Sequence, residues 1–282
     1  MRAKFGAAGN SDSFYKEGHK ASEEMPKWLC EFGLDAYEYQ CGNGVRCGEA
    51  TARRIALAAE EYNIEMSVHS PYYINLATPE DEKRMGGINY ILQSAQLAKF
   101  FGGERVVVHS GALGKLTREE ALEYAKKTLK MAREAMVSEG FENIRLCIET
   151  MGKINQLGNL EEVIELCKLD ESFLPCIDFG HLNARTLGSL KTKADFEVIF
   201  DAMKNGLGMD RLKVFHSHFS KIEYTKGGEK KHLTFDDTVF GPDFDYVAEI
   251  IKERDLAPTI ISESAGTQAE DALIMKKMYE NA

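Results

Sequence analysis

Residues 175–184 read PCIDFGHLNA, a short apolar run that stops at Asp178 and is followed three residues later by His181. A short apolar run is typical of a buried parallel strand. Polar residues at the C-terminal end of such a strand face the mouth of an α/β barrel, where these folds carry their chemistry. The stretch therefore predicts a barrel strand ending in two candidate metal ligands. Taken alone, it is equally consistent with a capped strand end and a hydrogen-bonded histidine.

Eight runs of this kind recur along the chain, separated by helical patterns. Capping-box spacing at Thr117 with Glu120 and at Thr267 with Glu270 predicts helix starts after the fourth and eighth runs. A barrel of eight strands and eight helices typically needs about 250 residues. We therefore predict one domain, residues 1–282, folded as a (β/α)8 TIM barrel. The eight runs are AKFGAA (3–8), AYEYQ (36–40), IEMSVHS (64–70), RVVVHS (105–110), IRLCIET (144–150), LPCIDFG (174–180), LKVFHSHF (212–219) and PTIISES (258–264).

Composition narrows the classes of protein. The chain is 44% hydrophobic and 28% charged, which is typical of a soluble globular protein. Because no apolar run approaches the roughly 20 residues of a membrane span and the N-terminus lacks a signal-peptide pattern, we expect a cytoplasmic protein. The six cysteines have no zinc-ribbon spacing and are expected to be reduced. The net charge of −10 argues against a broad basic nucleic-acid surface, although bound divalent cations would offset part of it.

The predicted strand ends carry mainly histidines and acidic residues. Buried charges cost several kcal/mol unless they are paired or bound to metal, so this clustering predicts a metal site. Imidazole and carboxylate ligands without thiolate suit zinc or manganese best. A catalytic zinc takes about three protein ligands, so this set predicts two or three ions, with Glu149 bridging a pair. The candidates are His69, His109, Glu149, Asp178, His181, His218, His232 and Glu263, with His216 as an alternative to His218.

Six motifs, in order, resemble those of the endonuclease IV family, the type 2 apurinic/apyrimidinic endonucleases within the xylose isomerase-like barrels. The resemblance implies a zinc-dependent nuclease that cleaves damaged duplex DNA at abasic sites, with Glu149 and Glu263 as catalytic residues. It also implies that Tyr72 inserts into the DNA at the lesion. Because a nuclease needs an open barrel mouth, we expect a monomer. The motifs are VHSPYYINL (68–76), VVVHSGA (106–112), CIET (147–150), CIDFGHLNA (176–184), HFSK (218–221) and SES (262–264).

The resemblance also implies how the ligands divide between ions. His69 and His109 would hold one zinc, and Glu149 would bridge it to a second. Asp178, His218 and Glu263 would complete the second site, and His181 with His232 would hold a third ion.

One departure from the family concerns the long loop at residues 220–237. The family has an Asp two residues before the equivalent of His232, where this chain has Lys230. Glu229 or Asp236 could substitute, although the spacing favours neither. We therefore predict that the third site is weakened or empty, and that Lys230 contacts a substrate phosphate as a point charge.

Two other functions stay open at this stage. A sugar isomerase or epimerase of the same superfamily would use one manganese ion, with Glu149 and Glu263 passing protons across a ketose. His69, His109 and His232 favour the nuclease, whereas the net acidity and the missing Asp favour the isomerase. A catalytically silent metal-binding homologue is the third alternative.

Overall fold

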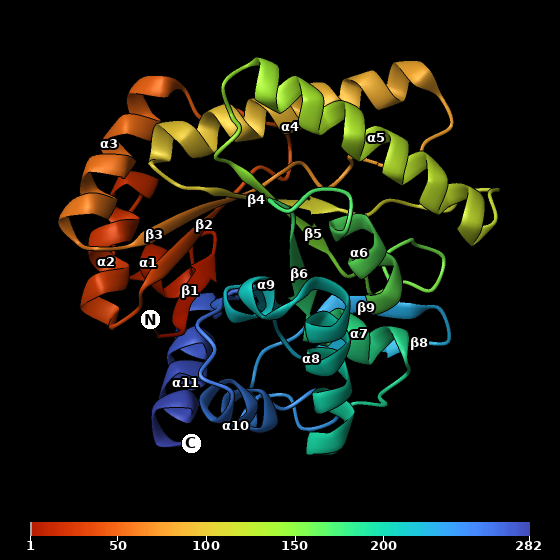
Figure 1. Cartoon of the computed structure of the whole chain (residues 1–282). Coiled ribbons are helices and arrows are strands. Elements are labelled where there is room, and N and C mark those ends of the chain that lie inside the picture. The colour runs from red at the N-terminus through yellow and green to blue at the C-terminus, as the bar shows by residue number, and fades with distance from the viewer. Residues whose placement is uncertain (1) are drawn as a thin grey trace.

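The computed structural model describes residues 2–282 and shows a closed barrel of eight parallel strands surrounded by helices (Figure 1). Each of the eight predicted runs contains a strand, and the last closes the ring by pairing with the first. This confirms the predicted TIM barrel. The seventh run is longer than its strand, because Leu212 and Lys213 belong to a helix and the strand begins at His216. The strands are β1 (Lys4–Ala8), β2 (Ala36–Gln40), β3 (Glu65–His69), β4 (Arg105–His109), β5 (Arg145–Glu149), β6 (Leu174–Asp178), β7 (His216–Phe219) and β10 (Thr259–Ser262).

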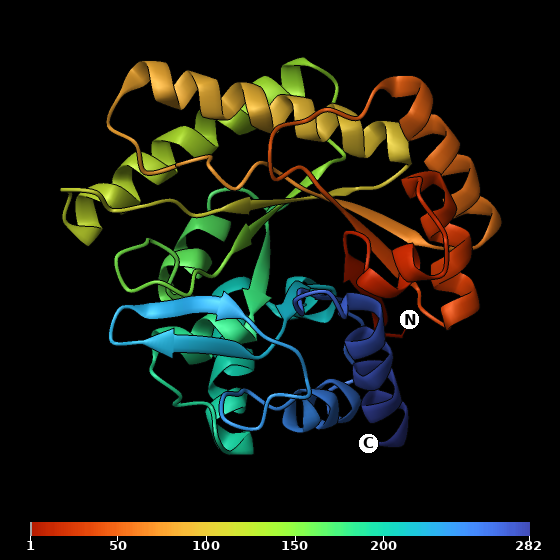
Figure 2. The same ribbon diagram turned by 180° about the vertical axis from the view of Figure 1, so that it is seen from behind.

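Helices cover the outside of the barrel, and the two longest, α4 and α5, lie side by side in both views (Figures 1 and 2). α5 begins at the predicted capping box, where the backbone N–H of Glu120 donates to the Thr117 hydroxyl. The second predicted helix start is also confirmed, because α11 begins directly after Thr267, but the box itself does not form: the Thr267 hydroxyl donates to Asp271 instead. The helices are α1 (Asp12–Lys16), α2 (Met25–Phe32), α3 (Glu49–Glu61), α4 (Asp81–Phe101), α5 (Arg118–Ser138), α6 (Leu160–Cys167), α7 (Phe179–Arg185), α8 (Lys193–Leu207), α9 (Met209–Lys213), α10 (Asp245–Glu253) and α11 (Gln268–Asn281).

Alternation along each strand decides which side chains enter the barrel. In β4, Val106 and Val108 join the large core between strands and helices, whereas Val107 packs inside the barrel with Cys147 and Cys176. Successive strand residues point to opposite faces, so residues two apart share the interior. The last inward positions of neighbouring strands therefore lie together at the C-terminal mouth.

The predicted loop at residues 220–237 contains an antiparallel hairpin, β8 (Ile222–Thr225) and β9 (Gly228–His232), drawn in blue in Figure 2. Its register shifts by one residue: Glu223 pairs with Lys231, but the next residue, Tyr224, pairs with Glu229. Lys230 is thus the extra residue of a β-bulge.

The cysteines and the helices bear on two expectations that came from the composition. The six cysteines form no disulfide in the structure, and four of them are buried. Among residues 2–282, no helix combines the length and apolar character needed to span a bilayer.

Candidate metal centre at the barrel mouth

The C-terminal mouth of the barrel encloses a cavity of about 320 Å³. Six of the eight predicted ligands line it, and the other two, Asp178 and His218, lie deeper and are fully buried. All eight candidates therefore lie at the same end of the barrel. Six of them stand at or directly after the ends of parallel strands, and His181 and His232 belong to the segments that follow β6 and β7.

The first group of ligands is His69, His109 and Glu149, whose ligand atoms all lie within 4.8 Å of one another. Glu149 Oε2 is 3.4 Å from His69 Nε2 and 3.2 Å from His109 Nε2. Both imidazoles therefore point at the same carboxylate oxygen.

The second group shares Glu149 with the first and adds Asp178, His218 and Glu263. Glu149 Oε1 is 3.2 Å from His218 Nδ1, and Glu263 Oε1 is 3.6 Å from the same nitrogen. Glu149 thus offers one oxygen to each group, which is the arrangement that a bridging carboxylate requires.

Asp178 acts as the helix cap that one interpretation of the opening stretch predicts, and it remains a candidate metal ligand. Its Oδ1 accepts a 2.7 Å hydrogen bond from the backbone N–H of His181 and so caps α7. Its Oδ2 is buried and has no hydrogen-bond partner. One oxygen caps the helix, and the other, 3.3 Å from His181 Nδ1, stays available as a candidate ligand atom.

The third group consists of His181, Glu229 and His232. Glu229 Oε2 is 3.4 Å from His181 Nε2. In a regular strand Glu229 and His232, three residues apart, would face opposite sides, but the bulge at Lys230 restores them to one side. The expectation that this group lacks a carboxylate is therefore wrong.

The same bulge turns Lys230 away from the cavity. Its Nζ lies 2.6 Å from Glu223 Oε1, and Lys231 approaches the same carboxylate at 3.4 Å. This position does not favour the predicted contact between Lys230 and substrate. Lys153 is instead the one lysine or arginine among the residues that line the cavity.

Backbone carbonyls orient three of the histidines. The Nδ1 atoms of His69, His109 and His181 lie 2.8, 3.1 and 2.9 Å from the carbonyl oxygens of Ser70, Tyr72 and Thr150. A carbonyl can only accept, so each Nδ1 carries the proton and each Nε2 presents a lone pair to the site. Metal-binding histidines are commonly held in this way.

The donor set fits bound cations. Glu149 Oε2 is buried without a hydrogen-bond partner, and two imidazole Nε2 atoms face it. Lone pairs that face a carboxylate repel it unless a proton or a metal ion lies between them. Zinc accepts both imidazole nitrogen and carboxylate oxygen, so the three groups suit zinc ions, and the mixed nitrogen and oxygen sets also suit manganese.

The close packing of imidazoles and carboxylates shifts the pKa values of the candidate ligands in the metal-free protein. Burial alone lowers the pKa of His69, but the neighbouring Glu149 carboxylate outweighs burial and raises it to about 9. Burial alone raises the pKa of Glu149, but His109, His181 and His218 hold it well below its usual range. Protons thus take the place of metal ions, and cation binding must displace them.

Comparison with known proteins gives the family. The sequence pattern of the xylose isomerase-like TIM barrels matches residues 26–278. The chain belongs to the xylose isomerase-like TIM barrel family. An uncharacterized protein of Methanocaldococcus jannaschii is 32% identical over 272 residues, which are 96% of this chain and 95% of that protein. A probable endonuclease 4 of Staphylococcus carnosus is 27% identical over 173 residues, or 59% of this chain and 56% of the relative.

Solved structures of differently named proteins share this fold at low identity. Endonuclease IV from Thermus thermophilus superposes with a TM-score of 0.69 at 16% identity and covers both chains completely. A D-tagatose 3-epimerase-like protein superposes with a TM-score of 0.73 at 21% identity, covering 99% of this chain and 97% of that one. Nuclease-named and epimerase-named members therefore carry the same barrel.

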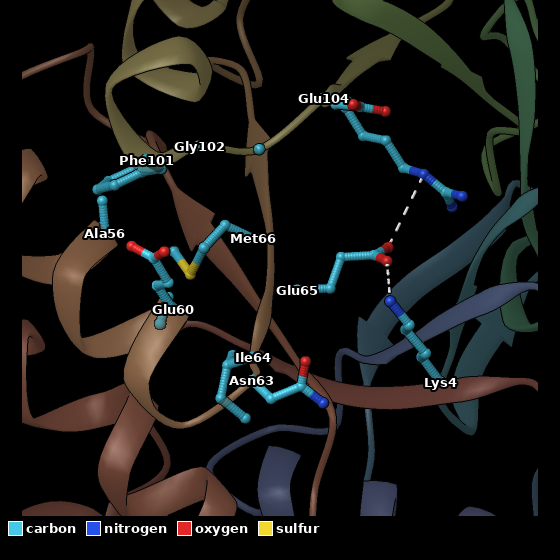
Figure 3. Close-up of a pocket in the computed structure, with 13 residues that line it drawn as sticks. Lys4, Ala56, Glu60, Asn63, Ile64, Glu65, Met66, Phe101, Gly102 and Glu104 are labelled. Carbon is cyan, nitrogen blue, oxygen red and sulfur yellow. Dashed lines mark hydrogen bonds and ion pairs between the residues drawn. The ribbon is translucent and has the colours of Figure 1, made fainter.

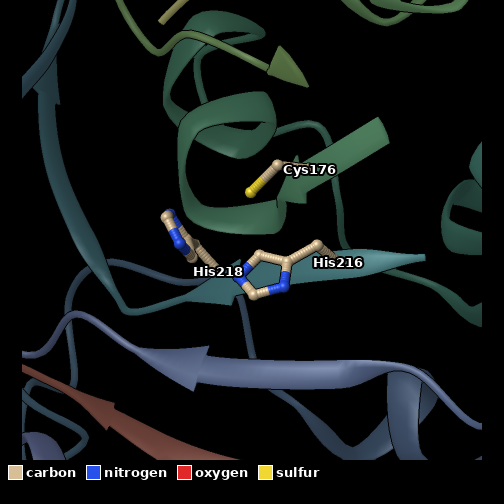
Figure 4. Close-up of side chains that lie close together, drawn as sticks. All are labelled: Cys176, His216 and His218. Atoms are coloured by element: carbon tan, nitrogen blue, oxygen red, sulfur yellow. The ribbon is translucent and has the colours of Figure 1, made fainter. Parts of the chain in front are cut away.

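Glu38 was not identified from the sequence as part of the site, and the sequence left open whether His216 or His218 is the ligand. Both histidines lie on β7, close to Cys176 on β6 (Figure 4). His218 faces Glu149, whereas His216 lies deeper, with Nε2 2.9 Å from Glu38 Oε2. The signal was available: Glu38 is a lone carboxylate inside the otherwise uncharged run AYEYQ.

Tyr72 lies on the rim of the mouth in this xylose isomerase-like barrel. Its side chain is 57% exposed and lines the cavity, while its carbonyl oxygen orients His109. An exposed aromatic side chain beside the candidate ligands is positioned to contact a substrate larger than the cavity.

Proposed function

We propose that this protein is a metal-dependent phosphodiesterase that cleaves duplex DNA at abasic sites, using two or three zinc ions, with manganese as the substitute. The observation that carries the proposal is Glu149, which offers one oxygen to each of two neighbouring groups of ligands. The relatives named endonuclease 4 support the same reaction class.

The chain's own residues suggest how the site would work. His69, His109 and Glu149 would hold one ion; Glu149, Asp178, His218 and Glu263 a second; His181, Glu229 and His232 a third. Bound ions of this kind supply Lewis-acid chemistry that activates water and stabilises charge on phosphodiester oxygens. Glu149 and Glu263 would fix the geometry of that chemistry and accept protons at the mouth.

Substrate contacts would come from the rim. Tyr72 would stack on or enter the duplex at the gap left by the missing base, because an exposed aromatic ring gains about 1–3 kcal/mol per stacked base. Lys153 would neutralise a phosphate at the cavity wall. These contacts are local, which is compatible with the net charge of −10.

A labelled duplex with one abasic site tests the proposal. We expect zinc- or manganese-dependent strand cleavage by the wild type and a large loss in Glu263→Gln. Tyr72→Ala should weaken cleavage of the duplex about tenfold or more, whereas Tyr73→Ala, a neighbouring exposed tyrosine packed on Tyr90, is the matched control. Wild-type cleavage no greater than that of Glu263→Gln would reject the nuclease.

A second candidate is a sugar epimerase that uses one ion. It is favoured by one observation: Glu149 and Glu263 belong to the same group of ligands, as a pair of proton-transferring carboxylates would. Metal content separates the two candidates. Two or three zinc ions per chain favour the nuclease, whereas one ion together with epimerisation of a ketose would favour the epimerase.

A further inference from the structure

His218 is oriented differently from the histidines that backbone carbonyls hold. Its Nδ1 faces Glu149 and Glu263, so Nδ1 is the nitrogen available to an ion in the second group. A ligating nitrogen cannot carry a proton, so Nε2 must carry it. Nε2 points into the barrel interior, where the nearest acceptor is a side chain rather than a carbonyl.

That acceptor is Glu38 on β2, on the opposite side of the barrel. Glu38 Oε1 is 2.9 Å from His218 Nε2, a close contact without hydrogen-bond alignment, and Oε1 also accepts a 3.2 Å hydrogen bond from Gln40 Nε2. Glu38 is fully buried, and its other oxygen lies 2.9 Å from His216 Nε2 and accepts a 2.9 Å hydrogen bond from the Ser67 hydroxyl. A buried carboxylate with this many donors is fixed in place.

His216 also helps to orient Glu38 from deeper in the barrel. Its Nδ1 lies 3.4 Å from an Arg105 guanidinium nitrogen, which can only donate, so Nδ1 accepts and Nε2 donates its proton to Glu38. Glu38 is therefore oriented by hydrogen bonds from Gln40 on its own strand, Ser67 on β3 and His216 on β7. Arg105 on β4 in turn orients His216.

The trio of Cys176, His216 and His218 could itself be taken for an ion site, since its ligand atoms lie within 4.8 Å of one another (Figure 4). The Glu38 carboxylate, however, lies 2.9 Å from Nε2 of both rings. It occupies the position that an ion bridging these nitrogens would need.

We infer that Glu38 is a positioning residue that fixes His218 with its Nε2 protonated and its Nδ1 lone pair directed at the second metal group. The inference rests on the proposed metal centre, but not on DNA being the substrate. Partners of metal-binding histidines typically contribute 10–100-fold to metal affinity. Loss of Glu38 should therefore weaken the binding of one ion and leave the binding of the others unchanged.

Zinc binding to the full-length protein is the test, measured by competition with a chelating dye. Glu38→Gln is nearly isosteric, and we expect one zinc ion to bind 10–100-fold more weakly. Glu162→Gln is the matched control, because Glu162 is also a buried carboxylate but pairs with Arg118 and caps α6. The control should retain wild-type zinc affinity.

Nitrogen-15 NMR of the zinc-loaded protein gives a readout that a general loss of stability would not move. In the wild type, His218 should show a zinc-bound Nδ1 and a slowly exchanging Nε2–H proton shifted downfield by the carboxylate. Glu38→Gln should shift that proton upfield and speed its exchange. Unchanged zinc affinity together with an unchanged His218 Nε2–H signal would overturn the inference.

Cys176→Ser separates positioning from a further ion site. We expect it to bind as many zinc ions as the wild type, with the same affinity. Loss of one zinc in Cys176→Ser would show that the buried trio itself binds an ion, and would also overturn the inference. Neither readout uses DNA, so failure of the nuclease assay is distinguishable from failure of this one.

Discussion

The two ends of the barrel each hold a carboxylate among basic groups, but in different states. At the N-terminal end, Glu65 lies 2.6 Å from Lys4 Nζ (Figure 3). It also lies 2.5 Å from the Thr259 hydroxyl and 3.9 Å from Arg105 Nε. At the C-terminal end, Glu149 faces imidazoles, and one of its buried oxygens has no hydrogen-bond partner. The first carboxylate is satisfied by permanent cations, whereas the second is satisfied only by protons or metal ions.

Cavity size does not reveal this difference. The cavity at the N-terminal end measures about 580 Å³, larger than the 320 Å³ of the mouth. Its central charged residues, Lys4, Glu65 and Arg105, pair with one another. The candidate metal centre lies instead where buried acceptors, such as Glu149 Oε2, are left without a hydrogen-bond partner.

The largest expected effect follows from removing the unpaired carboxylate. Glu149→Gln should reduce bound zinc by about two equivalents, because one shared carboxylate serves two groups of ligands. Metal content after gel filtration, determined by elemental analysis, measures it. Full zinc content in this variant would contradict the bridge.

The pH dependence should have opposite signs with and without metal. In the metal-free protein the pKa of His69 is raised from its ordinary value of 6.5 to about 9. The resulting stabilisation is complete below pH 6.5 and is lost as pH rises through about 9, by roughly 3 kcal/mol at most. Glu149, whose pKa is lowered, stays ionised across this window.

With zinc bound, the imidazoles must be neutral, so the stabilisation by zinc should increase over the same pH range. Urea denaturation at pH 6.5 and pH 9, in a strong chelator and in zinc, measures both trends. The same sign in the two series would mean that protons and zinc do not compete for this cluster.

The bulge places neighbouring residues on different sides of the hairpin: Glu229 faces the mouth, whereas Lys230 faces Glu223. Glu229→Gln should weaken one zinc ion by about 10–100-fold, because it removes the only carboxylate of the third group. Lys230→Met, the matched control, should leave zinc affinity unchanged, because its side chain pairs with Glu223. A larger zinc effect in Lys230→Met than in Glu229→Gln would contradict the bulged register.

The smallest effect is expected at the paired end. Glu65→Gln should lower the free energy of unfolding by about 1–3 kcal/mol, since Lys4 and Arg105 lose their partner. Zinc content should stay at the wild-type value. Thermal denaturation together with metal analysis checks both, and a loss of zinc would show that the two ends are coupled.

The sequence by itself determined the barrel and most of the centre. Short apolar runs specify parallel strands, and in a closed parallel barrel every strand ends at the same mouth. Residues at those ends, such as His69, Glu149 and Asp178, therefore meet whatever the details of packing. Local sequence patterns are sufficient to predict these contacts, because the parallel barrel brings the ends of all eight strands together.

Only the tertiary structure decided the remaining contacts. Glu229 joins His232 because a bulge shifts the register, and no residue spacing announces a bulge. Glu38 meets His218 across the barrel, at a separation of 180 positions in the chain. Even the choice of Nδ1 or Nε2 at each histidine depends on the acceptor that the fold brings to the other nitrogen. These features depend on contacts between distant segments, which local sequence patterns do not encode.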